Sequence, residues 1–190
     1  MYTIQNFETL LGTAGFSDQL LKNHFALYEG YVKNTNTLYD KLESLKSGGA
    51  LSTPEYAEMK RRFGWEYNGM RLHELYFGNL KKGGVALDEE SALARAFVAG
   101  FGGYNEWLAD FKATGAMRGI GWVVLVSDHT DKLLNIWINE HDVGLLAGAQ
   151  PLLVMDVFEH SFMIDYGLKR ADYIEAFLKA VDWEVVSKRF

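Results

Sequence analysis

Leu152-Leu-Val-Met-Asp-Val-Phe-Glu-His160 is an apolar run that ends in two carboxylates and an imidazole. Residues 152–156 have the composition of a buried β-strand. Burying Asp156 and His160 without partners would cost on the order of several kcal/mol each. Polar groups placed here therefore indicate a site in which they have partners. A strand leading into a helix can direct both into one pocket while Glu159 points elsewhere. The alternative is an Asp156–His160 hydrogen bond that only caps the following helix.

Two further runs upstream also predict strands. Residues 122–126 and 133–138 are short, apolar and mostly β-branched or aromatic. The polar, turn-prone residues 127–131 between them suit a hairpin connection. After the third strand, residues 165–186 return to helical spacing.

The first half of the chain has helical spacing. Ser17 fits the N-cap of a long helix over residues 17–44, and Pro54 suits the first turn of a second helix that continues to Phe77. Two shorter helices are expected at about 88–100 and 104–113.

The polar, glycine-containing segment Lys81-Lys-Gly-Gly84 is the expected domain boundary. The prediction is a helical hairpin domain over residues 1–84 and a second domain, with the strands, over residues 85–190.

Composition excludes several classes of protein. The 190 residues contain no cysteine, so thiolate metal sites, disulfides and cysteine nucleophiles are excluded. A net charge of −6 argues against nucleic acid as a partner. The sequence shows neither a secretory signal nor an apolar stretch that could span a membrane, so a cytoplasmic location without membrane association is expected.

The chain has five histidines, and each can be weighed separately. His24 and His73 lie on the apolar sides of the two long helices, where a lone histidine is usually a hydrogen-bonded core residue. Two facing helices favour a metal-ligand role for both histidines, because helical bundles commonly hold metal sites in their interior. His129 lies in a polar turn and is expected at the surface.

Together with Asp156 and His160, the two helix histidines would supply three imidazoles and one carboxylate. That donor set suits iron, manganese or zinc. The spacing does not reproduce the H-E-x-x-H pattern of zinc proteases, and it does not select among the metals.

At this point the chain resembles the iron/manganese superoxide dismutases over roughly residues 17–186. Four blocks carry the resemblance: His24 with Tyr31-Val-Lys-Asn-Thr-Asn36; Leu72-His-Glu-Leu-Tyr-Phe77; Gly119-Ile-Gly-Trp122; and Asp156-Val-Phe-Glu-His160 with Asp165-Tyr166 and Trp183-Glu-Val-Val186. The resemblance implies an α+β fold, in which an N-terminal α-helical hairpin packs on a C-terminal domain with a three-stranded antiparallel sheet and surrounding helices.

The resemblance also implies the chemistry of the site. One iron or manganese ion per subunit would be five-coordinate, bound by His24, His73, Asp156, His160 and a water or hydroxide. The substrate would be superoxide, converted to dioxygen and hydrogen peroxide as the metal alternates between its trivalent and divalent states.

Groups around the metal differ from the usual pattern of the family. Tyr31 matches the family's gateway tyrosine, which can join a proton relay. The family usually places a glutamine against the metal-bound solvent, but one of its two source positions is Gly69 here and the other is His141. His141 is therefore expected to contact both the solvent and Tyr31, and Trp122 to lie beside them. Neither glutamine source is present, so the choice of metal stays open, with iron favoured.

The resemblance further implies a homodimer, with a tetramer also compatible. Glu159 matches the residue that reaches the partner subunit's His160. A tyrosine usual at position 163 is Met163 here, which predicts a thinner hydrogen-bond network at the interface. Arg170 matches a cationic residue near the substrate funnel, and would supply the local attraction for an anion that the net charge lacks.

Two other functions would use the same ligands. A mononuclear non-haem iron oxygenase would need more open coordination positions and a pocket for an organic substrate. A non-catalytic metal-stabilised dimer would leave Tyr31 and His141 without an evident role.

Overall fold

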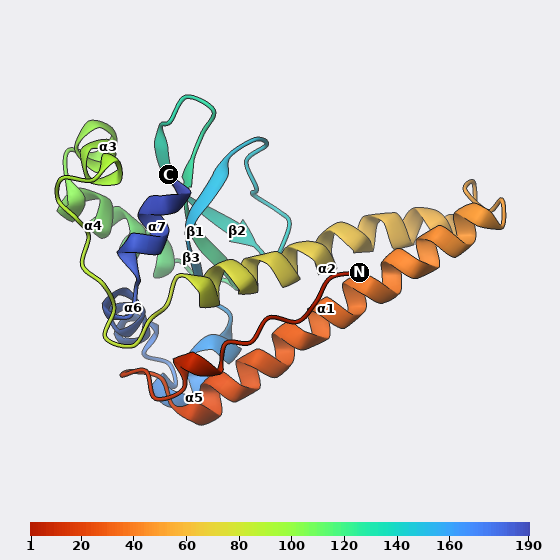
Figure 1. The fold of residues 1–190 in the computed structure, drawn as a ribbon, viewed down its shortest axis with the longest axis horizontal. Coiled ribbons are helices and arrows are strands. Elements are labelled where there is room, and N and C mark those ends of the chain that lie inside the picture. Colours follow the sequence, from red (N-terminus) through yellow and green to blue (C-terminus); the bar gives the residue numbers. More distant parts are fainter.

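The computed structural model describes all of residues 1–190 and confirms the α+β architecture (Figure 1). The helices are α1 (Asp18–Ser47), α2 (Pro54–Gly78), α3 (Ala92–Phe101), α4 (Tyr104–Gly115), α5 (Met163–Tyr166), α6 (Arg170–Lys179) and α7 (Trp183–Arg189). The strands are β1 (Gly121–Ser127), β2 (Leu133–Asn139) and β3 (Gln150–Asp156), and short 3-10 helices cover Glu8–Leu10 and Glu159–Ser161.

Helices α1 and α2 form the predicted hairpin, which projects from the rest of the molecule in Figure 1. The side chain of Ser17 caps α1 by accepting a hydrogen bond from the backbone N–H of Leu20. Thr53 caps α2 in the same way, and Pro54 occupies its first turn. The start of each helix therefore lies where the capping residues predict it, while α1 continues beyond the expected residue 44 to Ser47.

The amino-terminal segment runs along this hairpin (Figure 1). The Asn36 side chain on α1 accepts a hydrogen bond from the backbone N–H of Tyr2 at 2.8 Å and donates one to the carbonyl of the same residue at 2.9 Å. Farther along, the backbone N–H of Gln5 donates to the hydroxyl of Tyr28 at 3.0 Å. These contacts fix the segment against α1.

The three strands form one antiparallel sheet in the order β2-β1-β3. The central strand β1 is buried throughout, which explains its unbroken apolar sequence. Trp122 on β1 pairs with Asp156 at the end of β3. Directly paired residues of antiparallel strands put their side chains on the same face, so the register places these two side by side.

The region after the sheet is more divided than its helical spacing suggests. Residues 163–189 form three short helices, because Gly167 takes a positive φ of 53° after α5 and the side chain of Asp182 caps a new helix, α7. Helix α3 likewise starts at Ala92, later than expected, since the side chain of Ser91 caps it.

Buried Asn79, at the end of α2, ties the hairpin to the sheet. Its side chain donates to the carbonyl of Val154 at 3.0 Å and accepts from the N–H of the same residue at 3.1 Å. The Arg189 guanidinium adds a second tie by donating to Asn79 Oδ1 and to the carbonyl of Leu152. The helix that carries His73 is thereby held to the strand that carries Asp156.

A single cluster of 35 buried hydrophobic residues draws on both parts of the chain. The domain boundary near residue 84 stays a prediction. None of the helices combines the length and the apolar character needed to cross a bilayer.

Candidate metal centre

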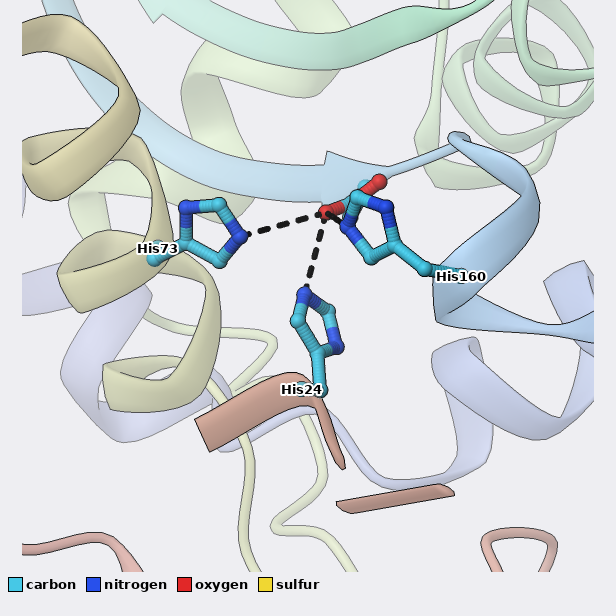
Figure 2. Close-up of side chains that lie close together, drawn as sticks. His24, His73 and His160 are labelled. Carbon is cyan, nitrogen blue, oxygen red and sulfur yellow. Dashed lines mark hydrogen bonds and ion pairs between the residues drawn. The ribbon is translucent and has the colours of Figure 1, made fainter. Parts of the chain in front are cut away.

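Four side chains from four elements converge between the hairpin and the sheet. His24 comes from α1, His73 from α2, Asp156 from the end of β3 and His160 from the 3-10 helix after it. One potential ligand atom from each lies within 4.8 Å of all the others. Figure 2 shows the three imidazoles pointing at one carboxylate oxygen from different directions. The predicted ligand set is therefore brought together.

The distances show how closely the three rings approach Asp156 Oδ2. The Nε2 atoms of His24 and His160 lie 3.1 and 3.2 Å from it, and that of His73 lies 3.8 Å away. The side chains of His24, His73 and Asp156 are fully buried, while that of His160 is 28% exposed.

Hydrogen bonds behind the cluster orient its members. A carbonyl can only accept, so His73 Nδ1 donates to the carbonyl of Gly69 at 2.6 Å and leaves Nε2 with a free lone pair. Asp156 Oδ1 accepts from the backbone N–H of Phe158 at 2.8 Å, which turns Oδ2 towards the histidines. The Tyr173 hydroxyl, 2.7 Å from the carbonyl of Asp156, holds the main chain at the same point.

The charges within the cluster are strongly coupled. Burial lowers the pKa of His24 and places that of His73 well below its usual value, so both rings are neutral at neutral pH. Burial acts to raise the pKa of Asp156, but His160 and His24 outweigh it and hold this pKa well below the usual range. Burial alone would lower the pKa of His160, but the neighbouring carboxylate of Asp156 outweighs burial and raises this pKa. The carboxylate is thus ionised, and its negative charge, directed at the three rings, would offset part of the charge of a bound cation.

The donor atoms fit a bound metal ion. His73 Nε2 and His24 Nδ1 are buried without a hydrogen-bond partner, which is unusual for polar atoms in a folded core. For His73 the unpartnered atom is the one that faces the cluster, where a metal would satisfy it. Three imidazoles and one carboxylate suit iron, manganese or zinc.

Tyr31 and His141 meet beside this cluster. The Tyr31 hydroxyl lies 2.7 Å from His141 Nε2, and its ring stacks on that of His73 with centroids 5.1 Å apart. On its other side His141 Nδ1 accepts a hydrogen bond from the indole N–H of Trp122 at 3.0 Å. The loop after β2 therefore brings His141 into the interior, where it is fully buried.

One neighbour of this group was not predicted. The ring of Trp65 lies 4.4 Å from that of His141 and 5.7 Å from that of Tyr31, measured between centroids. The helical spacing of residues 65, 69 and 73 puts Trp65 on the same face of α2 as His73, and this was the signal that could have identified it.

Two of the predicted residues, Glu159 and the half-buried Arg170, are not part of the ligand cluster. Glu159 is exposed beside His160. Arg170 donates to the carbonyls of Met117 and Gly119 at 2.7 and 2.9 Å, and so holds the segment before β1. His129 lies in the exposed turn between β1 and β2, as expected.

A buried cluster of three histidines and one aspartate, with a tyrosine–histidine pair beside it and held between a helical hairpin and an antiparallel sheet, defines a mononuclear metalloenzyme. Comparison with known proteins shows the family to which this metalloenzyme belongs. Residues 89–189 match the family model described as the C-terminal domain of iron/manganese superoxide dismutases.

Relatives extend this match over nearly the whole chain. The iron superoxide dismutase of Aquifex pyrophilus is 37% identical over 182 residues, which cover 93% of this chain and 84% of that protein. The iron enzyme of Cupriavidus metallidurans is also 37% identical, covering 93% and 89%. Manganese superoxide dismutase 2 of Haloferax volcanii is 34% identical, covering 92% and 86%. The chain belongs to the iron/manganese superoxide dismutase family and is a superoxide dismutase, an oxidoreductase.

Proposed function

We propose that this protein disproportionates superoxide at one iron ion held by His24, His73, Asp156 and His160, with Tyr31 and His141 beside the reacting oxygen. The observation that carries the proposal is the approach of three imidazole nitrogens to a single buried carboxylate oxygen within 3.8 Å. When bound, the metal supplies one-electron chemistry, taking an electron from one superoxide and giving one to a second.

The chain itself must supply charge balance and protons. Ionised Asp156 offsets part of the cationic charge, and the buried surroundings keep that interaction strong. Burial, reinforced by Glu66 and Asp156, raises the pKa of Tyr31 to about 12, so its hydroxyl is protonated at neutral pH. Burial lowers the pKa of His141 to about 4, so this ring is neutral. Tyr31 then holds one of the two protons that a superoxide needs when it is reduced to hydrogen peroxide.

Iron and manganese forms of the purified protein test the metal and the activity together. The protein is made metal-free with a chelator, divided and reloaded with each metal, and occupancy is measured by elemental analysis. We expect activity in the iron form to exceed that in the manganese form by about tenfold or more, because groups around the metal tune its redox chemistry by such factors.

Equal or greater activity with manganese would show that the iron preference is wrong. If both fully loaded forms were inert towards superoxide, the proposed function itself would fail. The metal-free protein is the control, and it should be inactive.

We also propose that the protein is a homodimer in which Glu159 reaches the partner subunit's His160. His160 is the one ligand with an exposed part, 28% of its side chain. The segment that follows it in the chain carries exposed apolar side chains, among them Leu168 at 91% and Ile164 at 52%. A second copy would cover both.

Sedimentation velocity tests this assembly. We expect a dimer at micromolar concentration, and a Glu159→Ala variant whose dimer dissociates more readily, with the exposed Glu29→Ala variant as control. A wild-type protein that sediments as a monomer at that concentration would exclude the proposal.

A further inference from the structure

The position of one hydrogen atom on His141 follows from its contact with Trp122. Indole Nε1 of Trp122 and Nδ1 of His141 are 3.0 Å apart, and both side chains are fully buried. An indole N–H can donate but cannot accept. His141 Nδ1 must therefore be the acceptor, with its lone pair directed at the indole.

This contact determines the tautomer of the ring. A neutral imidazole carries one hydrogen, and with Nδ1 accepting it must lie on Nε2. An imidazolium would place a second N–H against the indole N–H, which the 3.0 Å separation disfavours. Burial, which lowers the pKa of His141 to about 4, agrees with a neutral ring.

The direction of the next hydrogen bond then follows. His141 Nε2 lies 2.7 Å from the Tyr31 hydroxyl oxygen, so its hydrogen is donated to that oxygen. Tyr31 accepts this bond and cannot use its own hydrogen on the same contact. The hydroxyl hydrogen is left to point elsewhere.

Aromatic neighbours keep the His141 ring in this orientation. Phe158 stacks on it with an interplanar angle of 28° and a centroid distance of 5.2 Å, and Trp65 meets it edge-on. The indole N–H of Trp65 donates to Glu140 at 3.0 Å, so it does not compete with Trp122 for the ring nitrogen. A rotated ring would lose the hydrogen bonds at both of its nitrogens.

We propose that Trp122 is a positioning residue, which fixes His141 as the Nε2–H tautomer and thereby directs the hydroxyl hydrogen of Tyr31 away from His141, where a bound oxyanion can accept it. The inference rests on the proposed role of Tyr31 as proton source and adds the direction of the hydrogen bonds that supply it. With the opposite tautomer Tyr31 would donate to His141, and its hydrogen would be engaged there.

Nitrogen-15 NMR of the histidine rings tests the tautomer directly. The full-length protein is loaded with zinc, which is diamagnetic and accepts histidine and carboxylate ligands. In the wild type we expect His141 to show a protonated Nε2 and an unprotonated Nδ1 at neutral pH. A protonated Nδ1, whether in the other tautomer or in an imidazolium, would overturn the proposal without any variant.

Two tryptophan variants separate positioning from packing. Trp122→Phe keeps a ring but removes the N–H donor, and the ratio of the two tautomers should shift towards Nδ1–H by about fivefold or more, as expected for the loss of one hydrogen bond. Trp65→Phe removes the other indole in contact with His141 and should leave the ratio unchanged. A folded Trp122→Phe protein with the wild-type ratio would contradict the proposal.

The dismutase activity of the iron-loaded proteins is measured separately from the tautomer. An inactive wild type with the expected tautomer would defeat the proposed function and leave the tautomer assignment standing. An active wild type with a protonated Nδ1 would overturn the tautomer assignment and leave the proposed function standing.

Discussion

Asp156→Asn is expected to abolish superoxide dismutase activity while leaving the fold in place. The substituted side chain keeps nearly the same shape, and its oxygen can still accept the hydrogen bond from the backbone N–H of Phe158. What it loses is the negative charge on the oxygen that His24, His73 and His160 all approach. A buried cation without that charge is poorly compensated.

The expected effect is large because the charge is fully buried. We expect activity per subunit to fall on the order of 10³-fold or more, which corresponds to about 4 kcal/mol at ~1.4 kcal/mol per factor of ten. Metal content after dialysis against a chelator should fall as well, and elemental analysis measures it. Circular dichroism checks that the fold is retained.

Asp40→Asn is the matched control, because Asp40 is an exposed residue of α1. It removes the same charge from the protein and should change neither metal content nor activity. An Asp156→Asn protein that retained its metal and most of its activity would show that the carboxylate is not a ligand.

Gly69→Ala is expected to lower the dismutase activity by displacing the ring of Tyr31, which packs against Gly69. A Cβ atom at position 69 would lie 2.6 and 2.7 Å from two carbons of the Tyr31 ring, a distance that real contacts do not reach. The ring would have to move, and with it the hydroxyl that lies 2.7 Å from His141. Activity should fall by about 10- to 100-fold, the range found when groups that orient a metal site are displaced.

Stability should fall too, although alanine is the better helix former. The gain in helix propensity is about 1 kcal/mol, while overpacking a buried position costs about 1–3 kcal/mol. We therefore expect the free energy of unfolding to decrease by up to about 2 kcal/mol, measured by urea denaturation of the metal-free protein.

Gly64→Ala, on the same helix, provides the comparison. A Cβ at Gly64 would meet nothing within 4 Å. That variant should gain up to about 1 kcal/mol of stability and keep full activity. If both variants behaved alike, close packing of Tyr31 against Gly69 would not be what fixes the tyrosine.

His141 illustrates how an unusual residue can be accommodated. The sequence shows a histidine where the family usually has glutamine, at one of two alternative positions. An imidazole that accepts at Nδ1 and donates at Nε2 has the same polarity as a carboxamide, which accepts at its oxygen and donates at its nitrogen. The proposed tautomer would therefore let His141 take part in the same kind of hydrogen-bond chain.

Much of the fold was predictable from local signals. Ser17 and Pro54 mark helix starts because a capping side chain and a fixed φ act within one turn of the chain, and the structure has both helices there. The three strands were predictable because each is a short apolar run between turn residues. The ligands were predicted from the family blocks, since each histidine alone also fitted a place in the core.

Only the tertiary structure decided which groups surround those ligands. The pairing of Trp122 with Asp156 depends on strand register, and the contact of Trp122 with His141 depends on how a loop folds back after β2. The sequence determined helices, strands and candidate ligands, because caps, periodicity and residue type act over a few positions. Packing between distant segments decided the approach of Tyr31 to Gly69 and the hydrogen-bond chain through His141, because those contacts join residues 38 and 110 positions apart.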